Sequence, residues 1–368
     1  MTVLAVVQTW NRNDPIRGFI VPWMEALATR VDRVLILTLE QREQPRPSNI
    51  FVCSLGKESG AKRLGYLAAW HQAWRDILRG QPPDVVFTHM SPIFTVLSAP
   101  YTRRRRIPIV TWFAHRHVSP TLKLAHRLSA RVLTINPESY PYRPEEALFV
   151  GHGIDYDLFK PDGQTRDPGL LLSVARLSPI KDAGTFLRTV ERLRSAGHPV
   201  NARWVGQPPD RDRGYSSSID QLQEDLALED VVTFGGAVPN GDLPAWYCRS
   251  GAHVNLCPTG ALDKAPLEAM GCGTPTFVAN EGFRPLLGAW SDLLLFRHGD
   301  PVDLAHRVVR LRMLNEDVRR RLSADLRRAA MKQHGLAQLW DRLVAIFQTE
   351  IDRARGTREK PFGRRTGP

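Results

Sequence analysis

Short runs of branched apolar residues recur along the first half of the chain and alternate with longer amphipathic stretches. The apolar runs, at 3–9, 33–39, 84–88, 107–113 and 131–135, have the length and the valine and isoleucine content of buried strands. Helical spacing lies between them, at about 18–30, 60–79, 91–103 and 119–129. Strands that alternate with helices predict a parallel sheet covered by helices.

The second half repeats this alternation. It predicts strands at 169–174, 200–205, 231–234, 252–256, 275–279 and 293–296. Helices are predicted at about 182–196, 216–227, 242–248 and 264–271, with more beyond Asp300. The fold class is therefore α/β, with two facing, Rossmann-like, doubly wound domains and a central cleft. Ligands are expected beyond the carboxyl ends of the strands.

Proline, glycine and aspartate punctuate residues 160–168, and we place the domain linker there. The predicted domains are 1–163 and 164–335. The stretch 336–352 carries an apolar helix face (Leu336, Leu339, Leu343, Ile346 and Phe347), which predicts a helix that packs back toward the N-terminal domain. Residues 353–368 form a basic tail that we expect to be disordered.

At 368 residues the chain is long enough for two domains, and its formal charge is +12. This charge favours polyanionic partners, which include nucleic acid, anionic lipid and phosphorylated substrates. Solvated arginines that bind nothing are an equally good interpretation, even for the run Arg103 to Arg106.

The four cysteines have no metal-type spacing, and we expect them to be reduced and buried. No apolar run approaches the roughly 18 residues that cross a membrane. The N-terminus has no basic leader, so we expect a cytoplasmic protein.

The most informative segment is NLCPTGALDKAPLEAMGCGTPTF, residues 255–277. It combines a strand end, a glycine-bearing loop and a short helix, and helix N-termini bind phosphate through free N–H groups. Asp263 is a candidate cap, and Pro266 fits the first turn. We predict a phosphate-bearing ligand above Lys264. Glu268 suits the vicinal hydroxyls of a ribose, although an exposed helix residue is the alternative.

The loop in SVARLSPIKD, residues 173–182, follows the first predicted strand of the second domain. Arg176 and Lys181 would emerge there, close enough to clamp two phosphates. Solvated side chains are the alternative. In the first domain, His89 and His115 close two predicted strands and could exchange protons near neutral pH, although structural histidines are common. Gly18 could approach a ligand after the first strand.

Several well-known site motifs are absent from the sequence. No GxGxxG follows a strand and no GxxxxGK[ST] occurs, so neither a nicotinamide cofactor nor P-loop hydrolysis is supported. There is no HExxH pair and no GxSxG elbow.

Four longer segments resemble the family 4 glycosyltransferases, retaining enzymes with the two-domain GT-B fold. They are VGHGIDYDLFKP (150–161), SVARLSPIKD (173–182), VTFGGAVPNGDLPAWY (232–247) and PLEAMGCGTPTFVA (266–279). The resemblance covers about residues 3–350 and is strongest in the second domain. It implies sugar transfer from a nucleoside-diphosphate sugar to a glycan or lipid-linked acceptor, without a metal or other cofactor.

Residue by residue, the resemblance makes Arg176 and Lys181 ligands of the diphosphate and Glu268 the ribose ligand. The family's first motif glutamate is replaced by Gly260, with Asp263 and Lys264 in a DK pair nearby. Val238 matches the loop that touches the base, and His115 matches the histidine aimed at the sugar. Of a glycine-rich loop after the first strand, only Gly18 remains.

Three other functions stay open at this point. A sugar-nucleotide epimerase or hydrolase could use the same scaffold, and a family member could bind ligands without turnover. A basic nucleic-acid-binding protein is the rival from another class, but no binding motif supports it. The basic surface could also hold an enzyme against anionic lipid at the inner face of the cytoplasmic membrane.

Overall fold

The computed structural model describes residues 1–14, 17–60 and 63–356. The described residues form two compact units: Met1–Gly153 with Leu336–Gly356, and Ile154–Gly335. The change of unit comes before the predicted linker because residues after Gly153 already pack on the second unit. Phe159, for example, accepts a hydrogen bond from Arg327 at 3.1 Å through its carbonyl oxygen.

The first unit contains a parallel sheet in the order β3-β2-β1-β4-β5-β6-β7. Its strands are β1 (Thr2–Trp10), β2 (Arg33–Gln41), β3 (Ile50–Ser54), β4 (Val85–His89), β5 (Ile109–Trp112), β6 (Arg131–Thr134) and β7 (Ala147–Phe149). The helices are α1 (Ile20–Ala28), α2 (Arg63–Arg79), α3 (Pro92–Thr102), α4 (Pro120–Leu128) and α13 (Leu336–Gly356). Five of these strands and all four helices before α13 lie where the periodicity predicts them.

Both faces of this sheet are covered, and β1 shows how. Val3, Ala5 and Val7 belong to a core with α1 and α13. Leu4 and Val6 point the other way, into a core with α2 and α3. Alternate residues of a strand face opposite sides, so a strand buried on both faces reads as a continuous apolar run. This explains why β1 is recognisable from sequence.

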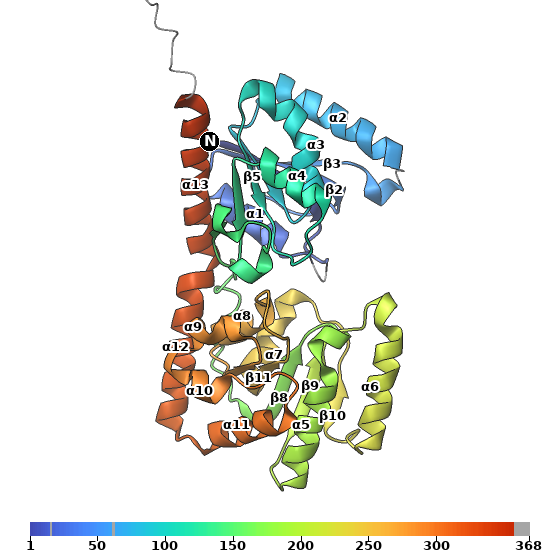
Figure 1. Ribbon diagram of the computed structural model, residues 1–368, viewed down its shortest axis with the longest axis vertical. Coiled ribbons are helices and arrows are strands. Elements are labelled where there is room, and N and C mark those ends of the chain that lie inside the picture. Colours follow the sequence, from blue (N-terminus) through green and yellow to red (C-terminus); the bar gives the residue numbers. More distant parts are fainter. Residues whose placement is uncertain (15–16, 61–62, 357–368) are drawn as a thin grey trace, which may run out of the picture. The chain divides into compact units, whose positions relative to one another are not determined.

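The last helix, α13, packs on the first unit by the apolar face predicted for it, beside α1 (Figure 1). It continues to Gly356, so the predicted disorder from Arg353 is wrong for residues 353–356. In this last turn, the Arg355 guanidinium forms an ion pair with Asp84 at 2.6 Å, which connects the end of α13 to the start of β4. The rest of the predicted tail, 357–368, lies outside the described residues.

The second unit has a parallel sheet in the order β10-β9-β8-β11-β12 (Figure 1). Its strands are β8 (Asp167–Val174), β9 (Asn201–Val205), β10 (Val232–Phe234), β11 (Ser250–Asn255) and β12 (Thr276–Val278). Its helices are α5 (Ala183–Ser195), α6 (Arg213–Asp225), α7 (Leu243–Arg249), α8 (Lys264–Gly271), α9 (Arg284–Leu287), α10 (Ser291–Leu294), α11 (Pro301–Met313) and α12 (Glu316–His334). The architecture is α/β with two parallel sheets, as predicted.

Two local predictions are wrong, and two edge strands are missing from the prediction. Residues 293–296 do not form a strand: Ser291–Leu294 is helical, and only Leu295 forms an isolated bridge, to Val278. The edge strands β3 and β7 are missing from the prediction although IFVCS and ALF are apolar, and at the edges of the sheet Phe51 and Phe149 are exposed. Cys53 lies on β3 and is exposed, whereas the other three cysteines are buried. Within the described residues, no helix is long and apolar enough to cross a membrane.

Candidate functional site

The second sheet reverses its strand order between β8 and β11. The chain runs outward from β8 through β9 to β10, then returns to place β11 on the other side of β8. Loops at such a reversal diverge and leave a crevice at the carboxyl ends of the strands. Residues 175–182 follow β8 and residues 256–263 follow β11, so the two most informative segments of the sequence meet here.

Lys181 and Asp263 form an ion pair across this reversal. The Lys181 Nζ lies 2.7 and 2.9 Å from the two carboxylate oxygens of Asp263, and 3.1 Å from the Cys257 Sγ. Asn255, the last residue of β11, donates a hydrogen bond from Nδ2 to the Asp263 carboxylate at 2.9 Å. The two charged side chains are 14% and 28% exposed, so the pair is shielded from water but still reachable.

Burial opposes both charges of this pair, and their mutual attraction overcomes it. Burial alone would lower the pKa of Lys181, but Asp263 raises it above its ordinary value. Burial alone would raise the pKa of Asp263, but Lys181 and hydrogen bonds from Cys257 and Asn255 bring it below its ordinary value. The pair therefore stabilises the fold at neutral pH. That contribution is lost as the pH falls through the lowered pKa of Asp263.

Asp263 immediately precedes α8, as predicted, but it does not cap the helix. Its backbone has an N-cap conformation (φ −78°, ψ 152°), yet its side chain makes no capping hydrogen bond. The carboxylate turns toward Lys181 and Asn255 instead. The Asp263 side chain therefore makes no hydrogen bond to the N–H groups at the start of α8. Pro266 lies in the first turn, where its missing N–H costs nothing.

Arg176 is exposed on a loop whose backbone is fixed on both sides. Ala175 donates to the Val205 carbonyl at 2.9 Å, and Leu177 donates to the Gln207 carbonyl at 3.2 Å. The side chain of Arg176 has no carboxylate partner among the described residues. A fixed backbone with an uncommitted guanidinium is suited to an anionic ligand.

Gly206 allows this loop to approach the end of β9. Its φ is +138°, and a Cβ placed there would overlap the carbonyl oxygen of Ala175 and lie 2.7 Å from the carbonyl carbon. The backbone of Gly206 also donates to the Gly236 carbonyl at 2.6 Å. Only glycine satisfies both the dihedral and the close approach.

Replacing Gly206 by alanine should lower the free energy of unfolding of the second unit by about 1–3 kcal/mol, because it adds backbone strain and displaces Ala175. Urea denaturation would measure the change. Gly241→Ala is the matched control, since a Cβ there meets nothing within 4 Å. Equal free energies of unfolding for the two variants would show that a Cβ at position 206 fits beside the Ala175 carbonyl, contrary to this prediction.

Glu268 is 7% exposed, not an exposed helix residue. Its Oε2 accepts a hydrogen bond from the Tyr247 hydroxyl at 3.1 Å, and the Asn240 side chain also bonds to it. Asn240 lies two residues after Val238, so the loop that follows β10 reaches Glu268. The structure thus brings Asn240, on the loop that contains Val238, close to Glu268 on α8.

Lys264 and Glu268 share one low-polarity environment and perturb each other. Burial lowers the pKa of Lys264, and the nearby Glu268 carboxylate partly offsets this. Burial raises the pKa of Glu268, against the opposing effects of Lys264, Tyr247 and Asn240. The carboxylate and the ammonium therefore both titrate closer to neutrality than usual. Perturbed groups at a strand-end crevice are typical of binding and catalytic sites.

Gly260 is buried, and its loop is fixed by Asn280. The Asn280 Nδ2 donates to the carbonyls of Gly260 and Ala261, at 3.5 and 3.2 Å. Residue 260 therefore presents backbone only, and the nearest carboxylate of the same loop is the one of Asp263, three residues later.

The predicted residues of the first unit differ in exposure. His115 is exposed, and its Nδ1 accepts a hydrogen bond from the backbone N–H of His117 at 3.0 Å. His89 is buried among aromatic rings, including Trp23 and Trp112 at centroid distances of 5.6 and 6.2 Å. Gly18 has a steric reason to be glycine, since a Cβ would lie 2.6 Å from the Asp14 carbonyl oxygen. The alternative structural interpretation therefore fits His89 best.

The sequence analysis does not indicate six residues that this site contains: Gly206, Asn240, Tyr247, Asn255, Cys257 and Asn280. Asn255 ends a strand beside the informative loop, which was a usable signal. Tyr247 and Gly206 are recognisable only from their tertiary contacts. Within the described residues, no group of three or more histidine, cysteine, aspartate or glutamate side chains is placed to hold a metal ion.

Residues 168–313, from β8 to the end of α11, match the family described as glycosyl transferases group 1. The matched stretch lies within the second unit of the chain. The match covers both loops of the Lys181–Asp263 pair and the whole of α8.

The curated relatives of this chain are distant. A D-inositol 3-phosphate glycosyltransferase from Thermomonospora curvata is 28% identical over 269 residues, which are 67% of this chain and 60% of that protein. A GDP-mannose-dependent alpha-(1-6)-phosphatidylinositol monomannoside mannosyltransferase from Mycolicibacterium smegmatis is 27% identical over 162 residues, 39% of this chain and 41% of that protein. The chain thus spans 60% or less of these relatives.

Solved structures establish the fold over almost the whole chain. Anabaena Alr3699/HepE in complex with UDP and glucose has a TM-score of 0.71 at 17% identity, covering 95% of this chain and all of that one. Sucrose-phosphate synthase from Thermosynechococcus elongatus has a TM-score of 0.72 at 16% identity, covering 96% of this chain and all of that one. The fold of this chain is GT-B.

Proposed function

We propose that this chain is a retaining glycosyltransferase that moves a sugar from a nucleoside-diphosphate sugar to an acceptor. The observation that carries the proposal is the Lys181–Asp263 pair at the strand reversal of a glycosyl transferases group 1 domain. The start of α8 and the exposed Arg176 lie on the two loops that meet there. Together they supply positive charge where a diphosphate would bind.

In the proposed reaction, the bond between the anomeric carbon and the β-phosphate oxygen breaks, and its electron pair stays on that oxygen. The sugar becomes oxocarbenium-like while negative charge grows on the leaving diphosphate. Lys181 would stabilise this charge as a point charge and Arg176 as a planar fork, from positions set before the reaction. Asp263 would act as a positioning residue, since its oxygens already bind Lys181 and Asn255.

The acceptor oxygen would attack the anomeric carbon on the face that the diphosphate leaves, and its proton would pass to the departing phosphate oxygen. This route, implied by the family resemblance, needs no second carboxylate. His115 as the residue that positions the sugar remains part of the proposal, and its exposure supports it. Gly18 and His89 would contribute through backbone shape and packing.

We assign the ribose of the donor to Glu268, with Val238 beside the base and Lys264 and Gly260 nearer the sugar. Glu268→Gln should weaken nucleoside-diphosphate binding about tenfold, because a carboxylate binds two hydroxyls more strongly than an amide does. The wild type should lose a similar factor with the 2′,3′-dideoxy nucleotide, and the variant should lose nothing further. Calorimetry would measure the affinity of the wild type and of Glu268→Gln for each nucleotide. If the variant loses as much affinity as the wild type when the ribose hydroxyls are removed, the assignment is contradicted.

We expect Glu268 to make the nucleotide affinity depend on pH. Burial raises the pKa of Glu268, so its carboxylate should be protonated at a higher pH than an ordinary glutamate. Affinity for the nucleotide should therefore fall as the pH is lowered through this raised pKa, and Glu268→Gln should remove that dependence.

The relatives suggest the substrate class. Their names include GDP-mannose and D-inositol 3-phosphate, and a structural neighbour binds UDP and glucose. We propose a UDP- or GDP-hexose donor and a hydroxyl-rich, phosphorylated or lipid-linked acceptor. Mass spectrometry of products with and without acceptor tests this. Sugar on the acceptor supports transfer, whereas free sugar or an epimerised nucleotide without acceptor would favour hydrolysis or epimerisation.

A second proposal concerns the arginine cluster, which we define as Arg103–Arg106, Arg353 and Arg355. All six side chains are exposed, and Arg105, Arg106 and Arg355 line one cavity of about 370 Å³ beside the start of β4 and β5. Their gathering from separate segments supports contact with an anionic membrane, where lipid-linked acceptors would be found.

Replacing Arg103 and Arg104 by serine should cost about 2 kcal/mol of membrane affinity, roughly 30-fold, at low salt. Flotation with vesicles that contain phosphatidylserine would measure it. The double variant Arg211→Ser, Arg213→Ser is the control, because these two residues are equally exposed in the second unit. Equal flotation of all three proteins, or none at low salt, would remove the proposal.

A further inference from the structure

A cavity of about 620 Å³ opens where the strands of the second sheet begin. Lys181 and Glu268 lie beyond the other ends of these strands. Arg166, Pro168, Gly251 and Pro275 line it, and each lies at or beside the first residue of a strand. The residues of the proposed donor site follow the carboxyl ends of the same strands. The cavity is therefore separate from that site, and its volume suits a small molecule.

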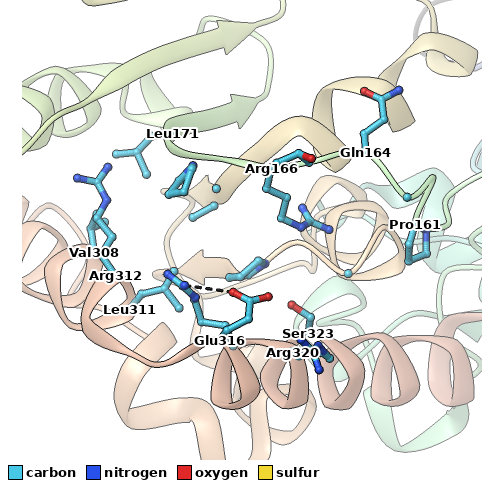
Figure 2. A pocket seen from close by; sticks show the side chains of 18 residues that line it. Pro161, Gln164, Arg166, Leu171, Val308, Leu311, Arg312, Glu316, Arg320 and Ser323 are labelled. Atoms are coloured by element: carbon cyan, nitrogen blue, oxygen red, sulfur yellow. Dashed lines mark hydrogen bonds and ion pairs between the residues drawn. The ribbon is translucent and has the colours of Figure 1, made fainter.

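The lining of the cavity is apolar with a cationic rim. Leu171, Val308 and Leu311 contribute from β8 and α11, whereas Arg166, Arg312, Arg319 and Arg320 contribute positive charge. Glu316 is the carboxylate among the described lining residues, and it is paired with Arg319 at 3.1 Å. Figure 2 shows Glu316 at the cavity, with Arg166 and Ser323 on opposite walls.

Two of these arginines are partly buried without a carboxylate partner among the described residues. Arg166 donates only to three carbonyls and to the Thr274 hydroxyl. Arg312 donates to the carbonyls of Pro199 and Gly169, and its Nε is buried without a partner. Burial lowers the pKa of both, and Asp167 offsets part of this for Arg312. Cations held by neutral acceptors retain most of their attraction for an anion.

We propose that this cavity binds a small organic anion, a carboxylate or a phosphate monoester carried on an apolar body. The arginine rim would bind the anionic group, and Leu171, Val308 and Leu311 would cover the apolar part. A nucleotide is a poor candidate, because no aromatic side chain lines the described cavity to stack on a base. The proposal does not depend on the glycosyltransferase assignment, since it uses none of the residues named for the donor.

The test is thermal unfolding of the full chain with hexyl phosphate, hexanoate and hexan-1-ol. We expect at least one of the two anions to raise Tm by about 2 °C at saturation, and the alcohol to do nothing. The phosphate and carboxylate arms show which head group binds. Excess UDP and GDP should not displace the anion, and Lys181→Met should leave the shift intact.

Variants connect the shift to the cavity. Arg320→Gln should weaken binding about three- to tenfold, and Ser323→Leu should abolish it by filling the space. Arg328→Gln is the matched control: like Arg320 it is exposed on α12 and paired with an aspartate three residues before it, but it does not line the cavity. No shift with either anion, displacement by UDP or GDP, or an unchanged shift in Ser323→Leu would overturn the proposal.

Discussion

Replacing Lys181 by methionine is expected to lower sugar-transfer turnover about 10²- to 10³-fold while the second unit stays folded. Methionine keeps the length and the apolar stem of the side chain but removes its charge. The loss should appear in kcat as well as in KM, because the negative charge on the diphosphate grows as the glycosidic bond breaks. Lys160→Met, an exposed lysine of the same unit, is the control.

The ion pair with Asp263 complicates that experiment, because the variant leaves a carboxylate facing the diphosphate. The double variant Lys181→Met, Asp263→Asn separates the two effects. Nucleotide affinity should recover in part when the repelling carboxylate is removed, whereas turnover should stay low because the stabilising cation is still missing. Full turnover in either variant would contradict the assignment of Lys181.

Arg166→Met should lower the free energy of unfolding of the second unit by about 3–5 kcal/mol, the largest stability effect that we expect. The Arg166 guanidinium donates to the carbonyls of Tyr247, Ser250 and Cys272 and to the Thr274 hydroxyl, at 2.7–3.2 Å. These groups lie at the C-terminal ends of α7 and α8, where the partial negative charge of the helix dipole stabilises a cation. Without it, buried carbonyls lose their donors.

Urea denaturation would measure this loss. The free energy of unfolding of Arg166→Lys should lie between those of the wild type and Arg166→Met, because an ammonium keeps the charge but cannot reach four acceptors at once. Arg328→Met serves as the surface control. A change below about 1 kcal/mol would show that water replaces the guanidinium easily.

Much of the fold was predictable because its strands are buried on both faces. Val3 to Val7 are all apolar for that reason, and the same holds for most of the central strands. The edge strand β3 is missing from the prediction although its sequence, IFVCS, is apolar, and nothing in the sequence indicates that Phe51 and Cys53 are exposed at the edge of the sheet. The segment 293–296 is apolar enough for a strand, but Ser291–Leu294 packs as a helical turn instead.

The sequence predicts those residues of the candidate site that lie on loops directly after predicted strands. The sequence indicates Lys181 because its loop follows the first predicted strand of the second domain, and Asp263 because it precedes a predicted helix that could bind phosphate. Their direct pairing was not predictable, since Asp263 had a simpler local role as a helix cap. Nor could the sequence indicate that Tyr247 binds Glu268, because α7 and α8 meet only in the folded unit.

The central claim is that the reversal between β8 and β11 binds the diphosphate of a sugar nucleotide. Calorimetric titration of UDP, GDP, uridine and guanosine into the wild type and Lys181→Met tests it most directly. One nucleoside diphosphate should bind the wild type at least tenfold more tightly than its nucleoside, and Lys181→Met should lose most of that difference. Equal affinity for nucleoside and diphosphate, or an advantage that survives in the variant, would contradict the claim.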